Sequence, residues 1–295
     1  MDILVTGSTG LLGKSLVPRL QQRGHRVLAF TGDIRDAQNV DEQVAQVQAV
    51  IHLAGVLDEN DALGLYEVNV GGTRHVLEAC EKHRVQHLIL ASTAGVYGKT
   101  TGILDEKTPM APETPYEKSK AQAETAAQAH LETIPLTIVR LALVLGPNEY
   151  WKGIVTMVKR NFPVIGNGSN AFMTVSGDDA ASAIAFLVGH PDAIGEIFIV
   201  AQEQAPSLNE VVGELRKQLG MNSEIRHMPY WQAMLGAYDS LVMTKITGKK
   251  TVFLPHHVER LVRERRYSID KIRALGWKPG DSTASAVQKM LAGLK

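Results

Sequence analysis

The chain has 295 residues, of which 44% are hydrophobic and 21% charged, a composition typical of a globular protein. Basic and acidic residues both number 31, so the zero net charge argues against nucleic acid as a partner. No apolar run approaches the roughly 18 residues of a membrane span. The N-terminus lacks the basic start of a signal peptide, and the lone Cys80 fits a reducing compartment. We therefore expect a cytoplasmic protein without a membrane span.

The first half of the chain alternates short apolar runs with longer helical patterns. The apolar runs lie at 3–5, 27–30, 50–53, 88–91 and 136–145, and the helical patterns lie at 11–23, 41–47, 66–83 and 116–132. Strands that are apolar on both faces and alternate with amphipathic helices are typical of a parallel sheet covered by helices. The pattern predicts an α/β fold with a Rossmann-type, doubly wound parallel sheet, whose ligands bind at the carboxyl ends of the strands.

The rhythm loosens after Gly146. We expect a turn at Gly166, a helix over 178–188, a strand over 196–201 and a helix over 207–219. An irregular region with Trp231, Tyr238 and Phe253 follows. We predict a nucleotide-binding domain in residues 1–146, completed by about 176–204. Residues 147–175 and 205–295 are then a small substrate-binding cap.

A glycine-rich turn, TGSTGLLG at 6–13, follows the first predicted strand and opens a helix. Gly7 allows a tight turn, Gly10 lets backbone amides approach a pyrophosphate, and Gly13 lets the helix pack against the strand. The other residues expected to contact a dinucleotide here are Thr9, Leu11 and Leu12. A tight turn that binds no ligand remains the alternative.

The ends of the next two strands bear on the cofactor. An acidic residue would hold the adenosine ribose of NAD, but the second strand ends in Thr31-Gly32, and Asp33 and Ile34 follow with Arg35. Arg35 suits the 2′-phosphate of NADP, and both charges also fit a solvated loop, so NAD and NADP both remain open. The HLAG stretch brings three small or apolar cofactor-contacting residues, Leu53, Ala54 and Gly55, whereas His52 is expected in the core.

TPYEKSK, residues 114–120, has the pattern of a capping box with proline at the first helical position. A helix that begins here places Tyr116 and Lys120 on one face. A neighbouring ammonium lowers the pKa of a phenol, so the pair suits proton transfer. In LASTAGVYG, residues 90–98, Ala91 and Ser92 are expected beside the cofactor and Thr93 beside the substrate. Capping of a loop by these hydroxyls is the alternative.

TGSTGLLG, HLAG, VNVGGT (68–73), STAGVYG (92–98) and PYEKSK (115–120) together resemble the extended short-chain dehydrogenase/reductase family, also called the NAD-dependent epimerase/dehydratase family. The resemblance implies that Tyr116 is the general acid/base. Lys120 binds the nicotinamide ribose, Thr93 orients the substrate oxygen and Asn69 braces the site. It also implies NAD or NADP as cofactor, no metal, and a homodimer formed through the helices near 66–83 and 116–132.

Branch markers of the family are mixed. Ala94-Gly95 replaces the Asp-Glu of sugar-nucleotide dehydratases, and Cys80 does not occupy the position of a catalytic cysteine. Leu143 stands where epimerases carry an asparagine, and Phe172 stands where they carry a diphosphate-binding arginine. With Val96, these two residues are expected to line the substrate pocket. RLALVLGP resembles the dihydroflavonol reductase-like and hydroxysteroid dehydrogenase-like members.

Two enzyme functions therefore remain. One is oxidation or reduction of a carbonyl/alcohol carbon in a small, moderately apolar molecule. The other is epimerisation of a nucleotide sugar, with phosphate contacts from basic residues elsewhere: Arg226, Lys249, Lys250, Arg260, Arg263, Arg265 and Arg266. These basic residues also fit a solvated helix face or a contact with anionic lipid or a partner protein. A non-catalytic dinucleotide sensor or assembly subunit is the third function, although such proteins commonly lose the Tyr–Lys pair.

Overall fold

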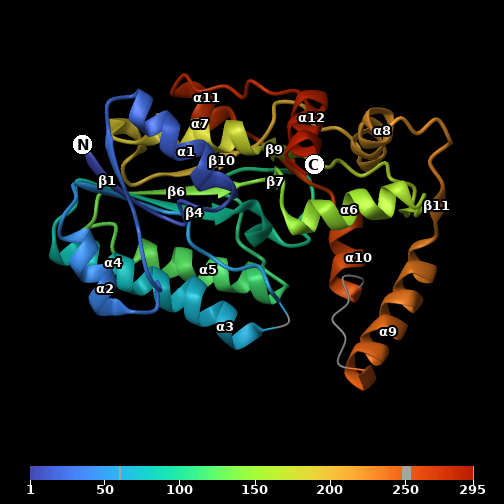
Figure 1. The fold of residues 1–295 in the computed structure, drawn as a ribbon, viewed down its shortest axis with the longest axis horizontal. Coiled ribbons are helices and arrows are strands. Elements are labelled where there is room, and N and C mark those ends of the chain that lie inside the picture. Colours follow the sequence, from blue (N-terminus) through green and yellow to red (C-terminus); the bar gives the residue numbers. More distant parts are fainter. Residues whose placement is uncertain (60, 248–253, 295) are drawn as a thin grey trace.

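A six-stranded parallel sheet forms the centre of the computed structural model, which describes residues 1–59, 61–247 and 254–294 (Figure 1). Its strand order is β10-β6-β4-β3-β1-β2, and every neighbouring pair is parallel. The strands are β1 (Asp2–Thr6), β2 (Arg26–Ala29), β3 (Ala49–His52), β4 (His87–Thr93), β6 (Leu136–Leu141) and β10 (Ile197–Val200). The predicted doubly wound parallel sheet is confirmed.

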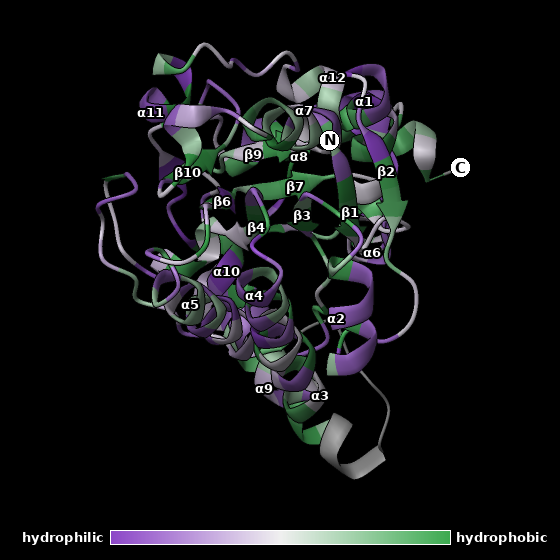
Figure 2. Ribbon diagram, turned by 90° about the vertical axis from the view of Figure 1, so that its left-hand side faces the viewer, coloured by the Kyte–Doolittle hydropathy of each residue, from purple (hydrophilic) through white to green (hydrophobic). Residues whose placement is uncertain are grey.

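Helices cover both faces of this sheet. One face carries α1 (Leu11–Gln22) and α7 (Gly177–Leu187), and the other carries α2 (Ala37–Val44), α4 (Thr73–Lys82) and α5 (Pro115–Gln128) (Figure 1). Successive strand residues face opposite sides: Ile3 and Val5 join the core under α1, while Leu4 joins the core over α2 and α4. Figure 2 shows the strands mostly in the green of hydrophobic residues, with much purple on α2 and α11.

The remaining elements lie beyond the carboxyl edge of the sheet or along one of its faces (Figure 1). Three two-stranded pairs join distant segments: β7 (Leu143–Leu145) with β9 (Thr174–Ser176), β8 (Val164–Ile165) with β11 (His227–Met228), and β5 (Ile103–Leu104) with β12 (Arg266–Tyr267). The helices of this part are α6 (Glu149–Lys159), α8 (Leu208–Gln218), α9 (Tyr230–Thr247), α10 (Pro255–Val262), α11 (Asp270–Ala274) and α12 (Thr283–Gly293).

Local chemistry explains where the helices differ from the sequence patterns. The helix expected over 41–47 starts at Ala37, because the Asp36 carboxylate accepts hydrogen bonds from two backbone amides of the first turn. The pattern at 66–83 divides into α3 (Ala62–Tyr66), a π-helical segment (Glu67–Gly72) and α4. The irregular region after 226 contains the long helix α9, which the sequence patterns did not predict. None of the helices among the described residues is long and apolar enough to cross a membrane.

Candidate active site

The glycine turn after β1 has a backbone that only glycine accommodates. Gly7 has φ +68°, and a Cβ atom there would lie 2.9 Å from the backbone nitrogen of Ala54. A Cβ atom on Gly13 would lie 2.4 Å from the carbonyl oxygen of Gly7. Gly10 caps α1, whose N-terminus therefore opens at the carboxyl edge of the sheet. The cradle fits a pyrophosphate, since the missing side chains leave backbone amides accessible. Of the other turn residues, Thr9 is exposed and Leu11 and Leu12 are half-buried.

The loop after β3 is fixed against this turn. Thr6 Oγ1 accepts a hydrogen bond from the Ala54 amide at 3.1 Å, and it lies 2.7 Å from Nδ1 of His52. Nε2 of His52 lies 3.1 Å from Thr73 Oγ1. Burial, with a smaller contribution from the charge of Lys120, lowers the pKa of His52 to about 3. His52 is therefore a neutral core residue, as predicted, and Leu53, Ala54 and Gly55 continue the chain along the turn.

Asn69 ties three parts of the site together. Its side-chain amide both accepts from the Val56 nitrogen at 2.9 Å and donates to the Val56 oxygen at 3.0 Å. The same nitrogen donates to Ser119 Oγ at 3.0 Å, and Ser119 donates to the backbone oxygen of Tyr116 at 2.8 Å. Asn69 is buried within the π-helical segment. It therefore joins the loop after β3 to the first turn of α5.

The first turn of α5 has the predicted capping box. The Thr114 side chain accepts from the Glu117 amide at 3.2 Å, and Glu117 Oε2 accepts from the Thr114 amide at 3.1 Å. Tyr116 and Lys120 follow at adjacent positions on one side of the helix. Nζ of Lys120 is buried and donates to the Ala91 carbonyl oxygen at 2.7 Å. That bond ties α5 to the end of β4.

The prediction that Lys120 lowers the pKa of Tyr116 stays a prediction, because Lys120 is not among the groups that shift this pKa most. Burial raises the pKa of Tyr116 to about 12; the charge of Arg260 opposes this rise, and the charges of Glu59 and Glu117 add to it. Burial also lowers the pKa of Lys120 to about 8, with Glu124 acting in the opposite direction.

Thr93 and Ser92, at the end of β4, have hydroxyls in different surroundings. Thr93 Oγ1 accepts from the Gly95 amide at 3.0 Å and lies in the wall of a polar pocket. The Ser92 hydroxyl instead donates to the buried carboxylate of Glu124. Arg140 forms an ion pair with the same carboxylate at 2.7 Å. The prediction that both hydroxyls emerge at the cofactor is therefore corrected for Ser92, because successive strand residues face opposite sides of a sheet.

The residues after β2 form an ion-pair group. Arg35 donates to Asp33 Oδ2 at 2.6 Å and to Glu67 Oε2 at 3.3 Å. Hydrogen bonds from the Arg35 side chain and backbone lower the pKa of Asp33 to about 2. The Arg35 guanidinium therefore already faces two carboxylates. The Ile34 side chain is corrected to a core position, where it packs with the apolar residues of α2 and α4.

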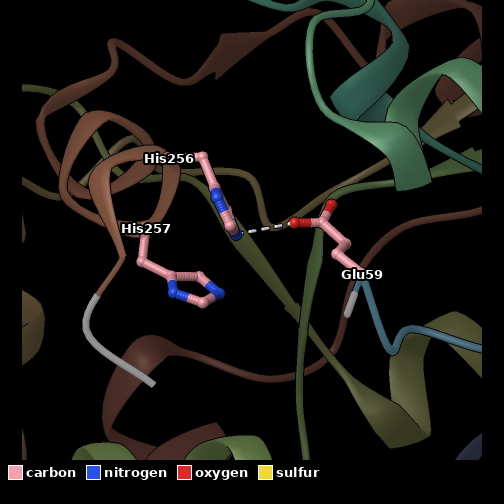
Figure 3. Close-up of side chains that lie close together, drawn as sticks. All are labelled: Glu59, His256 and His257. Carbon is pink, nitrogen blue, oxygen red and sulfur yellow. Dashed lines mark ion pairs between the residues drawn. The ribbon is translucent and has the colours of Figure 1, made fainter. Parts of the chain in front are cut away.

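A contact that the sequence did not indicate joins the loop after β3 to α10. Glu59, on the loop after β3, lies 2.9 Å from Nε2 of His256 (Figure 3). Its carboxylate also lies 3.7 Å from Nη1 of Arg260. Its Oε1 accepts from the Tyr116 amide at 3.3 Å. Burial raises the pKa of Glu59, but contacts with His256, Thr114 and Arg260 outweigh burial and lower this pKa to about 2. His257 brings a third ligand-type atom to within 4.8 Å of the other two. The ion pair with His256 accounts for this arrangement.

The polar pocket beside Thr93 contains three arginines of the predicted basic cluster. Arg263 is buried and forms ion pairs with Glu117 Oε1 at 2.6 Å and Glu113 Oε2 at 2.5 Å. It is therefore part of the fold and not of a solvated helix face. Arg260 and Arg265 lie in the same wall, with Leu143 opposite. Sequence patterns could not indicate these contacts, since 146 residues separate Glu117 from Arg263.

Arg265 has no carboxylate partner among the residues that the structure describes. Its guanidinium stacks over the Phe172 ring at 4.4 Å from the centroid, and its Nη2 donates to the Arg260 carbonyl oxygen at 2.7 Å. Nη1 is buried, and among the described residues it has no hydrogen-bond partner. Burial and the neighbouring charges of Arg260 and Arg263 lower the pKa of Arg265 from its usual value. A half-buried cation with an unpaired, buried Nη1 suits an anionic ligand.

Phe172 separates the polar pocket from a second, apolar pocket. Side chains from α6, the 162–165 segment, α8 and α10 line this apolar pocket, and they include Trp151, Ile154, Val164, Leu208, Val212 and Leu261. The prediction that Val96 faces substrate is corrected, because its side chain is fully buried in the core under α1. Of the remaining basic residues, Arg226 and Arg266 are exposed, whereas Lys249 and Lys250 lie outside the described residues, as does Phe253.

Comparison with known proteins identifies the family. The family model described as the NAD dependent epimerase/dehydratase family matches residues 3–201. The chain belongs to this family. The membership confirms the resemblance seen in the motifs, makes the chain an enzyme of this NAD(P)-dependent group, and agrees with the cradle at Gly7 and Gly13.

The relatives of this family member act on different substrates. The chain is 28% identical, over 94% of its length and 90% of the relative, to an N-acetyl-alpha-D-glucosaminyl-diphospho-ditrans,octacis-undecaprenol 4-epimerase of Escherichia coli O157:H7. It is 32% identical, over 75% of its length and 76% of the relative, to a 2-alkyl-3-oxoalkanoate reductase of Stenotrophomonas maltophilia. The fold matches a UDP-glucose 4-epimerase of Thermotoga maritima solved with UDP-glucose, with a TM-score of 0.79, 20% identity, and coverage of 99% and 98%.

Proposed function

We propose that this enzyme is an epimerase that reversibly oxidises a secondary alcohol carbon of a sugar joined to a diphosphate. The observation that carries the proposal is the half-buried Arg265, whose buried Nη1 lacks a hydrogen-bond partner and which lies in the pocket of Thr93 without a carboxylate partner among the described residues. A diphosphate supplies both the charge and the acceptor oxygens that this guanidinium lacks. Arg265 thereby binds the diphosphate, the role of the arginine that epimerases carry at the position of Phe172. The relatives include enzymes of sugars linked to undecaprenol and to UDP.

The proposal gives each site residue a role. When bound, NAD(P) supplies reversible hydride transfer at its nicotinamide ring. Tyr116 acts as the general acid/base: its phenolate takes the proton of the sugar hydroxyl as hydride leaves the carbon, and its phenol returns that proton when hydride comes back. The Thr93 hydroxyl orients the same oxygen from the other side. Lys120 and Asn69 position Tyr116, through Ala91 and Ser119 respectively.

The cofactor we propose is NAD. Arg35, the residue suited to a 2′-phosphate, is already bonded to Asp33 and Glu67, and the two carboxylates would repel that phosphate. Elimination of water is not part of the proposal, because Ala94-Gly95 follows Thr93 and offers no acid for it.

A second candidate is simple reduction of a ketone in a molecule that has one anionic group and an apolar body. The apolar pocket beside Phe172 favours it, and so does the 32% identity with a reductase of 2-alkyl-3-oxoalkanoates. Reduction consumes NADH in proportion to product, whereas epimerisation leaves the total NADH unchanged. Absorbance at the NADH band during turnover therefore separates the two.

Arg265→Gln tests the anion site, with Arg266→Gln as the matched control, since Arg266 is the next residue in the chain and is exposed. We expect Arg265→Gln to raise the KM for a UDP- or polyprenol-linked sugar by about tenfold or more, the loss of one charged hydrogen bond. Arg266→Gln should leave KM unchanged. Equal KM values for the wild type and Arg265→Gln would contradict the proposal.

Three further expectations belong to the same proposal: a cytoplasmic location, a homodimer through α4 and α5, and the division into a nucleotide-binding domain and a substrate-binding cap. The two helices lie side by side on one face of the sheet, which supports the dimer (Figure 1). Most alanines of α5 face the chain's own core, so Thr125 and Ala129 are the small residues left exposed for a second copy. A monomer in sedimentation velocity would contradict the expected homodimer.

A further inference from the structure

The long helix α9 exposes a stripe of large hydrophobic side chains. Trp231, Leu235, Tyr238 and Val242 are each between 54% and 59% exposed. Their spacing of four, three and four residues places them on one side of the helix. Figure 1 shows α9 extending away from the central sheet, at the lower right. Among the described residues, therefore, these four side chains have mostly solvent around them.

The opposite side of α9 is also apolar. Ala233 and Ala237 are fully buried and pack with Ile165 and Val258. A helix at a protein surface normally shows polar residues on its outer side. α9 is instead hydrophobic on both sides, so its outer stripe requires a partner that removes it from water.

The surroundings of the stripe favour a lipid surface as that partner. Trp231 and Tyr238 are the side chains that concentrate at the boundary between headgroups and acyl chains. Lys159, Arg160 and Arg226 are exposed near the start of α9, and none has a carboxylate partner among the described residues. The Arg226 carbonyl accepts from the Val164 amide at 2.8 Å, which places Arg226 beside the end of the 160–164 segment. Such cations complement anionic headgroups.

The apolar pocket connects this helix to the candidate active site. Leu261 lines the pocket and also packs in the cluster that contains Ala233 and Ala237. Phe172 forms another part of the pocket wall, and Arg265 stacks on its other side. An apolar chain attached to an anion at Arg265 therefore meets, across Phe172, a pocket whose Leu261 also belongs to the cluster beneath α9.

We propose that α9 docks the enzyme on the surface of an anionic phospholipid bilayer, and that the diphosphate of its substrate carries a polyprenyl chain drawn from that bilayer. The second half rests on the proposed function, and the first half stands on α9 alone. Docking buries the Trp231–Val242 stripe in the headgroup region, and the apolar pocket receives the first isoprene units of the chain.

The docking is tested with the full chain and vesicles of phosphatidylcholine containing phosphatidylglycerol, by flotation. The test variant is the triple substitution Trp231→Ser, Leu235→Ser and Tyr238→Ser. The matched control is Leu63→Ser with Ile103→Ser, because these two side chains are 73% and 67% exposed elsewhere on the surface. We expect the wild type and control to float with the vesicles, and the triple variant to lose binding by at least about tenfold. High salt should weaken wild-type binding.

Two results would overturn the docking: a wild type that does not float, or a triple variant that floats equally well. A wild-type dimer that the triple variant converts to monomer would likewise overturn it, because a second copy would then cover α9. Circular dichroism of the triple variant establishes that it is folded.

The substrate half has a separate readout. The wild type is assayed with two N-acetylhexosamines. One is linked to a polyprenyl diphosphate and is embedded in the same vesicles, and the other is linked to UDP. We expect turnover of the polyprenyl form, and loss of that turnover in the triple variant, while a short-chain, water-dispersed analogue is turned over equally by both. Turnover of the UDP form alone would overturn the substrate half. Vesicle binding without turnover of either sugar would contradict the proposed function and leave the docking intact.

Discussion

Arg263 and Glu117 form a buried ion pair, with 2.6 Å between Nη1 and Oε1. The other carboxylate oxygen of Glu117 accepts hydrogen bonds from the backbone amides of Glu113 and Thr114, and so caps α5. One side chain therefore fixes the start of the helix that carries Tyr116 and Lys120, and also holds the segment that carries Arg260 and Arg265. The orientation of the phenol and the shape of the polar pocket are thus linked.

Removal of the Glu117 carboxylate should destabilise the fold more than loss of the α5 cap alone. Glu117→Ala leaves Arg263 buried with only Glu113 as partner, and we expect a loss of about 3–5 kcal/mol in the free energy of unfolding. Glu117→Gln keeps an acceptor for the cap and should lose less. Lys118→Ala, at an exposed neighbouring position, should change the value by less than about 0.5 kcal/mol. Urea unfolding measures all three, and equal effects of Glu117→Ala and Lys118→Ala would refute the linkage.

The cofactor preference should follow from the ion pairs of Arg35. We expect NAD to bind at least about tenfold more tightly than NADP, because the 2′-phosphate of NADP would meet the carboxylates of Asp33 and Glu67. Asp33→Ser removes one carboxylate partner of Arg35 and should reduce the difference between the affinities for NAD and NADP. Asp41→Asn removes an exposed carboxylate that pairs with Lys82 and should leave it unchanged. Titration calorimetry gives both affinities, and tighter binding of NADP to the wild type would contradict the expectation.

Acid should destabilise the protein through two buried histidines. Burial lowers the pKa of His52 to about 3 and that of His87 to about 4, from the usual 6.5. Below pH 6.5 the unfolded chain binds protons that the folded chain does not, so stability falls as pH falls toward these values. Each histidine contributes a slope of up to about 1.4 kcal/mol per pH unit.

Unfolding in urea at a series of pH values measures this slope. His52→Gln should reduce the slope, whereas His227→Gln, at an exposed position, should not. An unchanged slope in His52→Gln would show that His52 does not take up a proton on unfolding in this range.

The sheet and the catalytic helix were predictable because their signals are local. Strands apolar on both faces, a glycine turn and a capping box each occupy a few adjacent residues, and the structure has them where the sequence predicts them. The Ser92 error came from treating neighbouring hydroxyls alike, although alternation along β4 sends them to opposite sides. The site roles of Tyr116, Lys120 and Thr93 remain predictions.

The parts that could not be predicted depend on contacts between distant segments. The pairing of Arg263 with Glu117 and the stacking of Arg265 on Phe172 join residues that are far apart in the chain. The burial that raises the pKa of Tyr116 likewise depends on how α10 and the Glu59 loop pack over it. α9 was missed because it is apolar on both sides, which removes the periodic contrast that marks a surface helix.

Tyr116→Phe tests the central claim most directly, because it removes the single phenolic oxygen that exchanges the proton. The measurement is interconversion of epimers of a diphosphate-linked N-acetylhexosamine, followed by NMR, with NAD affinity measured on the same preparation. The account predicts that Tyr116→Phe binds NAD as the wild type does and loses turnover by at least about a hundredfold. Wild-type turnover in Tyr116→Phe would contradict it.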